Sequence, residues 1–180
     1  MNDEVTILDK TFLVSITADQ IQSRINDIAK KLNISHNGKR PLFLAILNGS
    51  FIFASDLLKK ISIDCEISFI KLASYIGTSS SGKITTIIGL SESLKGKDII
   101  IVEDIIDTGR TMKNLLGILH DHSPESITIV TLLFKKEALI ENIQPDHVGF
   151  VVPDKFLVGY GLDYNSFGRN LQNIYVLKDH

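Results

Sequence analysis

The sequence predicts an α/β fold, with a mainly parallel, twisted sheet flanked by helices. Short runs that are almost entirely apolar, such as 41–47 (PLFLAIL) and 98–102 (DIIIV), are typical of strands covered on both faces. These runs alternate with segments whose apolar residues recur at helical spacing, the pattern of a parallel α/β sheet. The length of 180 residues fits one domain, and we expect residues 1–180 to form it.

The first elements are a helix and a buried strand. Thr17, with Gln20 three residues later, forms a capping-box pattern that begins a helix. Its buried face is expected at Ile21, Ile25, Ile28 and Leu32. The polar stretch 35–40 ends this helix, and the strand 41–47 follows.

Asn48, Gly49 and Ser50 then turn the chain into a second helix at 51–60. The buried face of this helix is expected at Phe51, Ala54, Leu57 and Leu58. Residues 65–73 read as a strand, 77–82 (GTSSSG) as a mobile loop, and 83–90 as another strand.

The second half repeats the alternation. A turn at 95–97 precedes the buried strand 98–102, and a helix is expected at 112–119. The remaining strands are expected at 126–134, 149–152 and 174–177.

Charge and composition exclude several classes of protein. Nineteen Lys and Arg against 21 Asp and Glu give a net charge of −2, which provides no positive field for nucleic acid. The single cysteine, Cys65, cannot form an internal disulfide, and the five histidines show no zinc-type spacing. No signal peptide or membrane-length apolar run occurs. We therefore expect a cytoplasmic protein with small-molecule partners, without nucleic acid or membrane.

The strongest chemical signal follows the strand 98–102. Ligands of parallel sheets lie beyond the carboxyl ends of the strands, where this chain places Glu103, Asp104 and then 107–111 (DTGRT). Gly109 permits a tight turn, two threonines flank it, and the free amides of a helix start attract anions. A phosphate is the expected occupant of this turn.

The adjacent carboxylates of Glu103 and Asp104 would repel one another if buried bare, so a cation or a ribose diol should lie against them. Because side chains alternate along a strand, we expect the two acids to face different pockets. The alternative is that both are surface acids and that Asp107 merely caps the next helix.

The segment 102–112 (VEDIIDTGRTM) resembles the phosphoribosyl-diphosphate signature of the phosphoribosyltransferases, in the form used by the hypoxanthine-guanine enzymes. Three further segments are similar to that family: 47–57 (LNGSFIFASDL), 69–75 (FIKLASY) and 152–169 (VPDKFLVGYGLDYNSFGR). The resemblance covers about three quarters of the chain, 41–177. It implies the type I phosphoribosyltransferase fold, with a small hood formed by N-terminal residues and roughly 145–180.

The resemblance also implies the reaction, in which phosphoribosyl diphosphate donates its 5-phosphoribosyl group to hypoxanthine, and to guanine as a second substrate. Asp107 would act as general base beside the purine. The phosphate and ribose would be bound by Glu103, Asp104, Asp107, Thr108, Gly109, Arg110 and Thr111. Magnesium is the implied cofactor, with Glu103, Asp104 and Asp163 as its ligands.

The same resemblance places the purine and the diphosphate. The purine would contact Lys135, Phe156, Leu157 and Asp163, and the diphosphate would contact Asn48, Gly49, Lys71 and Arg169. Ser74 and Tyr75 would belong to a lid over the site. The chain has Asn48 and Lys71 where the family commonly has lysine and arginine, so the amides of Gly49 and Ser50 are expected to carry more of the diphosphate binding.

Several of these residues have a plainer interpretation. Phe156 would be an ordinary core aromatic residue, and Lys135 and Arg169 would be solvated charges. Asp163 would make a local Asx-turn.

Rival functions fit the sequence less well. The stretch 77–83 matches the start of a P-loop, but Ile84 stands where a magnesium-binding hydroxyl is required. No GxGxxG pattern is present, and a receiver domain would leave 156–164 without a purpose. An RNA-binding regulator on the same fold would need a basic face. Exposed apolar helix faces favour a homodimer or homotetramer.

Overall fold

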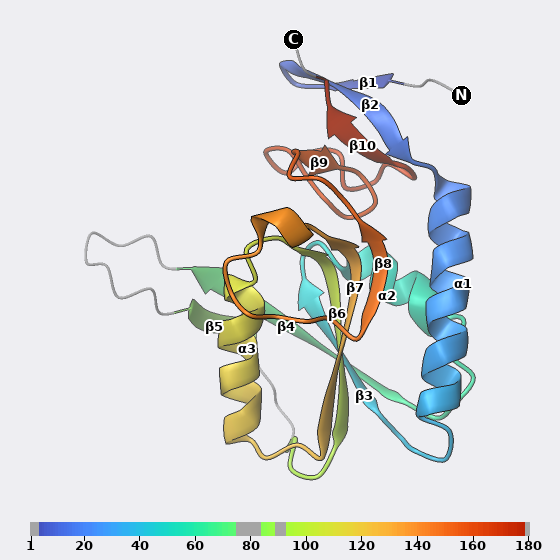
Figure 1. Ribbon diagram of the computed structural model, residues 1–180, viewed down its shortest axis with the longest axis vertical. Helices are drawn as coiled ribbons and strands as arrows, with labels where there is room; N and C mark the ends of the chain where they lie inside the picture. Colours follow the sequence, from blue (N-terminus) through green and yellow to red (C-terminus); the bar gives the residue numbers. More distant parts are fainter. Residues whose placement is uncertain (1–3, 75–83, 89–92, 179–180) are drawn as a thin grey trace.

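The computed structural model describes residues 4–74, 84–88 and 93–178. Its larger sheet has six strands in the order β5-β4-β3-β6-β7-β8 (Figure 1). These strands are β3 (Leu42–Leu47), β4 (Glu66–Ser74), β5 (Ile84–Ile88), β6 (Asp98–Ile106), β7 (Ser126–Phe134) and β8 (His147–Val151). All neighbours are parallel except β4 and β5, which are antiparallel. The predicted α/β class with a mainly parallel sheet is therefore confirmed.

Helices cover both faces of this sheet (Figure 1). One face packs against α1 (Ala18–Ser35) and α2 (Phe51–Leu58), and the other packs against α3 (Arg110–Asp121). The predicted capping box of α1 is present, because the Thr17 hydroxyl accepts from the Gln20 amide and the Gln20 side chain accepts from the Thr17 amide. The predicted face of α1 is the buried one.

A smaller antiparallel sheet lies beyond one end of the larger one and unites the two ends of the chain (Figure 1). Its order is β1-β2-β10-β9, with β1 (Glu4–Ile7), β2 (Lys10–Ile16), β9 (Leu157–Val158) and β10 (Ile174–Leu177). β10 is among the predicted strands, whereas the β1–β2 hairpin and β9 are not. The hairpin turns at Leu8, which has a positive φ of 54° without the glycine that usually marks such a turn.

Two predicted details are wrong. The strand 98–102 continues to Ile106, because the neighbouring β7 extends to Phe134 and keeps pairing with it. In α2 the buried residues are Phe53, Ala54 and Leu57, whereas Phe51 is 43% exposed. A helix of eight residues that is apolar almost all round gives too little periodicity to identify its buried face.

Among the described residues, no helix is both long enough and apolar enough to cross a bilayer.

Candidate active site

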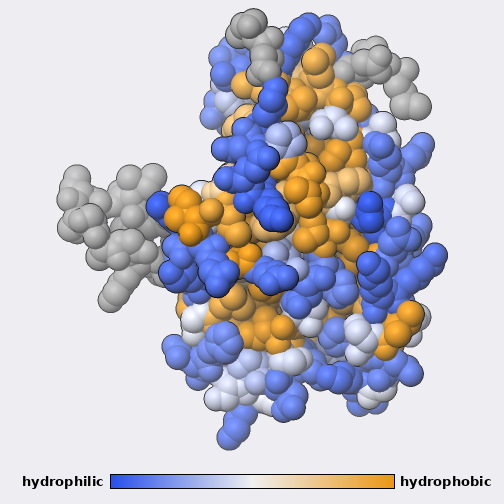
Figure 2. All heavy atoms as spheres, viewed as in Figure 1, coloured by the Kyte–Doolittle hydropathy of each residue, from blue (hydrophilic) through white to orange (hydrophobic). Residues whose placement is uncertain are grey.

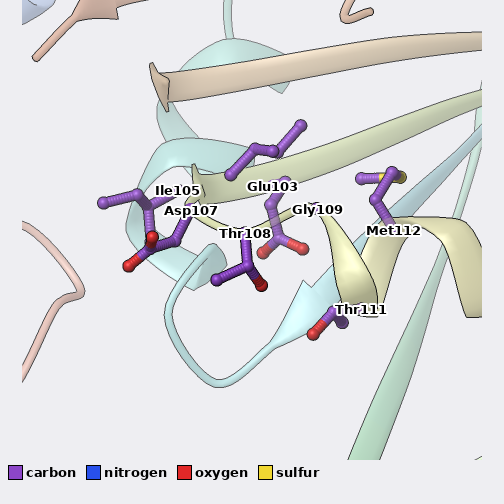
Figure 3. Close-up of a pocket in the computed structure, with 8 residues that line it drawn as sticks. Glu103, Ile105, Asp107, Thr108, Gly109, Thr111 and Met112 are labelled. Carbon is purple, nitrogen blue, oxygen red and sulfur yellow. The ribbon is translucent and has the colours of Figure 1, made fainter. Parts of the chain in front are cut away.

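The carboxyl ends of β3 and β6 lie side by side, and two cavities open at the loops that follow them. The larger cavity is about 260 Å³. It is lined by Asn48, Gly49, Asp104, Ile105, Asp107, Lys135, Phe156, Leu157, Leu162, Asp163 and Arg169. The smaller is about 80 Å³ and is lined by Glu103, Ile105, Ile106, Asp107, Thr108, Gly109, Thr111 and Met112 (Figure 3). Most of the sequence-predicted site residues therefore meet at one edge of the sheet.

The smaller cavity is formed by the turn from β6 into α3 (Figure 3). Gly109 is the N-cap of α3 and has a left-handed φ of 80°, which a side chain would strain. Gly109 provides no side-chain cap, and the hydroxyl of Thr108 accepts from the Arg110 amide at 3.5 Å. The N–H groups of a helix's first turn suit an anion. The alternative that Asp107 caps this helix is therefore wrong. Hydroxyl-bearing Thr108 and Thr111 line the same space, which suits a phosphate.

The paired acids lie within β6 and face different cavities, as expected from strand alternation. Glu103 lines the smaller cavity and Asp104 the larger. Glu103 is only 6% exposed, which contradicts the surface-acid alternative for this residue. Burial, together with the adjacent Asp104, raises the pKa of Glu103 well above its ordinary value. A hydrogen-bond donor or a cation placed here would relieve that unfavourable charge.

Close backbone contacts bring three loops together around the larger cavity. A Cβ atom added to Gly49 would lie 1.7 Å from Oδ2 of Asp104, so a side chain here would displace that carboxylate. A Cβ atom added to Gly161 would lie 2.0 Å from the carbonyl oxygen of Gly49. The loop after β3, the acidic strand β6 and the loop after β9 thus touch one another.

A buried lysine links two carboxylates at the wall of the larger cavity. Nζ of Lys135 lies 3.1 Å from Oδ2 of Asp107 and 3.1 Å from Oδ1 of Asp154. The Lys135 side chain is 9% exposed, so it is not a solvated charge at a strand end. Burial would lower the pKa of Lys135, but the hydrogen bonds to Asp154 and Asp107 outweigh it and raise that pKa.

Phe156 belongs to a cluster of three rings but is 46% exposed, so it is not an ordinary core residue. Its ring centroid lies 6.3 Å from Phe12 and 5.9 Å from Tyr164, which it meets edge-on. Leu157 pairs with Val176, while the Leu177 amide donates to the Phe156 carbonyl. In an antiparallel ladder this pattern turns the backbone groups of Leu157 away from β10.

Asp163 and Arg169 form an ion pair at the wall of the larger cavity. Nη2 of Arg169 lies 2.5 Å from Oδ1 of Asp163, and Nη1 donates to the Gly161 carbonyl at 2.7 Å. The other carboxylate oxygen of Asp163 accepts from the Ser166 amide at 2.7 Å, a local turn contact that resembles the Asx-turn alternative. Arg169 is thus held in place and is not a free surface charge.

Some predicted residues do not line either cavity. Arg110 is exposed on the first turn of α3, and Lys71 lies beside Leu47 in the β3–β4 register, next to the 48–50 loop. Tyr75 and the stretch 77–83 fall outside the described residues, as does the side chain of Ser74. Sequence reasoning missed Asp154, although it lies in the recognised segment 152–169. A carboxylate two residues before Phe156, the predicted purine-stacking residue, is the sequence feature that could have indicated Asp154.

A parallel sheet, a helix start that opens into a cavity and acids at the strand end are typical of the α/β proteins that bind phosphorylated ligands. The sequence profile described as "Phosphoribosyl transferase domain" matches residues 17–165, and the chain belongs to that family. Within it, the chain is similar to a hypoxanthine-guanine phosphoribosyltransferase from Lactococcus lactis. The two are 43% identical over 95% of this chain and 94% of the relative.

A solved structure and a longer relative agree with this assignment. The hypoxanthine phosphoribosyltransferase of Staphylococcus aureus superimposes with a TM-score of 0.88 at 38% identity, covering 98% of this chain and 93% of that one. The bifunctional protein TilS/HprT of Listeria monocytogenes is 40% identical over 92% of this chain. The matched part is only 26% of that longer protein.

Proposed function

We propose that the chain transfers the 5-phosphoribosyl group of phosphoribosyl diphosphate to hypoxanthine, and to guanine as a second acceptor, releasing diphosphate. The observation that carries this proposal is the placement of Lys135, Asp107 and Phe156 in one cavity that adjoins the phosphate turn. An ammonium donor suits a six-oxo group, a carboxylate suits a purine N–H, and an aromatic ring suits the purine face. The products are IMP and GMP, which makes the chain a purine salvage enzyme.

The two cavities divide the substrates between them. We assign the 5-phosphate to the turn at 107–111, where the helix-start amides and hydroxyls provide donors. Arg110 would contribute its backbone amide, since its side chain is exposed on the first turn of α3. We assign the ribose hydroxyls to Glu103, which lines the smaller cavity, and to Asp104, which lines the larger one. The purine then occupies the larger cavity between Phe156 and the Lys135 ammonium.

The residues of the larger cavity suit a reaction in which the ribosyl carbon gains positive charge as diphosphate leaves. Asp107 is positioned to hold the proton of the incoming purine, and Lys135 to hold its oxygen. Arg169, held by the Gly161 carbonyl, would neutralise charge on the departing diphosphate, and Asn48 and the Gly49 amide would donate hydrogen bonds to it. We also propose that Lys71 contacts the diphosphate and that Ser74 and Tyr75 belong to a lid. Mutagenesis of each residue would test these roles.

Magnesium is the proposed cofactor. Among the described residues, no group of three or more His, Cys, Asp or Glu side chains forms a ready-made metal cage. Mg²⁺ is usually held by one or two carboxylates together with water and substrate phosphates, so Asp104, Glu103 and Asp163 fit a metal that arrives with the diphosphate. When bound, the metal supplies positive charge to the leaving group. The raised pKa of Glu103 reflects the charge that such a cation would relieve.

The decisive experiment is an assay with purified protein, phosphoribosyl diphosphate and Mg²⁺. Hypoxanthine should give IMP and guanine GMP, both measured by chromatography. Competition among hypoxanthine, guanine and xanthine would rank the acceptors. Lack of product from every purine in the panel would overturn the proposal.

We also propose a cytoplasmic homodimer or homotetramer. Apolar side chains cover much of the upper half of the face shown in Figure 2. On β4, the strand next to the edge strand β5, Ile67 and Phe69 lie on one face and are both substantially exposed, as is Phe51 on α2. Large apolar side chains exposed in this way are typical of surfaces that another protein covers. Light scattering after gel filtration would give the number of subunits.

A further inference from the structure

Asp154 bonds Lys135 at the wall of the larger cavity, and neither the sequence pattern nor the proposed reaction assigns this carboxylate a task. It lies in the segment 152–156, between β8 and β9, and its Oδ1 atom is 3.1 Å from Nζ of Lys135. The segment is fixed at its start, since the Val152 amide donates to the Phe134 carbonyl at 3.0 Å. Phe134 and Lys135 are neighbours, so Asp154 and its partner rest on the same strand end.

The ammonium group of Lys135 is held from two sides. Asp107 and Asp154 each accept one hydrogen bond from it, and an ammonium group has three N–H donors. A third donor is thus available to a ligand in the cavity that Lys135 lines. Two acceptors at fixed positions restrict the directions in which this donor can point.

The two carboxylates differ in what the reaction demands of them. In the proposed reaction Asp107 also accepts the purine proton, so its carboxylate is shared between the purine and Lys135. Asp154 lies outside the cavity lining and is 61% exposed, so it can keep its bond throughout. Asp154 also lies two residues before Phe156, which ties the lysine to the ring that would stack on the purine.

We propose that Asp154 is a positioning residue that holds the Lys135 ammonium toward the six-oxo group and thereby sets the affinity for the purine. This inference rests on the proposed function. The pKa of Lys135 supports it. Burial alone would lower that pKa, but the hydrogen bonds to Asp154 and Asp107 raise it and so keep the ammonium charged. The expected signature is a defect in purine binding without a defect in phosphoribosyl diphosphate binding.

Steady-state kinetics provide the first test. Asp154→Asn and Asp154→Ala should raise the KM for hypoxanthine about fivefold, the scale of one exposed charge-assisted hydrogen bond. The KM for phosphoribosyl diphosphate and kcat should stay within about twofold. Asp154→Glu should recover part of the loss because it restores the carboxylate. Asp27→Asn, on the exposed side of α1, is the matched control and should change nothing.

A double-mutant cycle separates this role from a general structural effect. In a Lys135→Ala background, Asp154→Ala should raise the hypoxanthine KM no further, since its target is gone. An undiminished effect of Asp154→Ala in that background would overturn the proposal. An unchanged hypoxanthine KM in both Asp154→Asn and Asp154→Ala would also overturn it.

A chemical test works without turnover. Acetic anhydride modifies the neutral amine. Loss of the Asp154 carboxylate should lower the pKa of Lys135, so Lys135 in Asp154→Asn should be acetylated faster than in wild type. The folded protein would be treated, then digested, and the acetylated peptides measured by mass spectrometry. Lys39, paired with Asp98 at the amino end of β6 and so at the opposite end of the sheet from the site, is the internal reference. Equal Lys135 rates in both proteins would refute the contact. Absence of turnover in wild type, with faster Lys135 acetylation in the variant, would instead refute only the proposed reaction.

Discussion

The ion pair between Lys135 and Asp107 joins two groups to which we assign roles in purine binding. Their charged atoms lie 3.1 Å apart, and the lysine is buried while the carboxylate remains half exposed. Burying an ammonium costs free energy unless anions accompany it, so the two carboxylates make a charged lysine acceptable in this wall. The same geometry keeps the carboxylate and the ammonium on one side of the cavity, where a purine would meet both.

Replacement of Asp107 tests the assignment of the base. Asp107→Asn keeps the size of the side chain but cannot accept a proton, so kcat should fall about 100-fold. The KM for phosphoribosyl diphosphate should change much less. Stopped or quenched initial-rate assays with hypoxanthine would measure both, with the exposed Asp121→Asn as control. Wild-type turnover in Asp107→Asn would remove this residue from the base role.

Replacement of Lys135 tests purine recognition. Lys135→Ala removes the donor to the six-oxo group and leaves the phosphate turn intact, so hypoxanthine affinity should fall about tenfold or more. Binding of phosphoribosyl diphosphate should be nearly unchanged. Isothermal titration of each ligand would measure the two effects separately. Equal losses for both ligands would argue for a general disturbance of the site.

At the scale of single residues, the sequence identified the chemistry but not every partner. Glu103, Asp104 and Asp107 were predicted because three acids follow an apolar strand within a few residues. Asp154 was missed because its partner Lys135 lies 19 positions away in the chain, and nothing local indicates that they meet. Residue types report which chemistry is available, whereas contacts between loops depend on how the sheet brings those loops together.

Among the elements, the loop after β9 is braced against α2. The hydroxyl of Tyr160 donates to Oδ2 of Asp56 at 2.7 Å, and Nε2 of Gln22 donates to the same oxygen at 2.8 Å. Tyr160 is buried and precedes Gly161, whose Cα abuts the Gly49 carbonyl. The brace therefore fixes the hood segment relative to the loop proposed to bind diphosphate.

Removal of this brace should lower stability in a pH-dependent way. Burial opposes ionisation of Asp56, but the bonds from Tyr160, Lys59 and Gln22 outweigh it and lower the pKa of Asp56 below its model-peptide value of 3.8. A depressed pKa stabilises the fold above about pH 4, and this contribution is lost as the pH falls through the folded-state pKa. Tyr160→Phe should therefore cost about 1 kcal/mol at pH 7, after allowance for partial exposure of Asp56, and less at pH 3.

Urea denaturation at both pH values would measure the free energy of unfolding. Tyr164→Phe is the matched control, since its hydroxyl donates to the exposed Asp9 and should contribute less. A cost for Tyr160→Phe that is independent of pH would show that the carboxylate is not its partner in solution.

The elements themselves were largely predictable. The helix at Thr17, the strand at 126–134 and the strand at 174–177 follow from capping chemistry and apolar runs, and all three are present. The buried face of α2 and the length of β6 were not, because packing against α1 and pairing with β7 decided them. Local propensity therefore predicts the type of an element more reliably than it predicts where that element ends, because the ends depend on neighbouring elements.

For the whole molecule, one core joins the two sheets. Leu157, Tyr160 and Ile174 of the C-terminal segment pack in the same buried cluster as Phe43 and Val102 of the larger sheet. This continuity supports our proposal that residues 1–180 form a single domain whose hood is the smaller sheet. Phe12 of the N-terminal hairpin then reaches Phe156, so the first strand pair supports the proposed purine site.

Substrate binding should stabilise the whole fold. Saturating phosphoribosyl diphosphate with Mg²⁺ should raise Tm by roughly 5 to 10 °C, because a ligand at 100 times its Kd contributes about 2.7 kcal/mol. Chelation of the metal should abolish most of this shift if Mg²⁺ arrives with the diphosphate. Ribose 5-phosphate, which lacks the diphosphate, should give a smaller shift that chelation leaves unchanged. Differential scanning fluorimetry would measure all four conditions, and an EDTA-independent shift with the full substrate would argue against the metal.

The sequence alone determined the class of fold, the phosphate turn and the acids beside it, because each depends on residues that are neighbours in the chain. Hydrophobic periodicity and helix-start chemistry act over a few residues and can be read directly. The tertiary structure decided that Lys135 is clamped by Asp107 and Asp154, that Gly49 and Gly161 touch, and that Phe12 supports Phe156. Those contacts join segments far apart in sequence, and only the pairing of strands and the packing of loops specifies them.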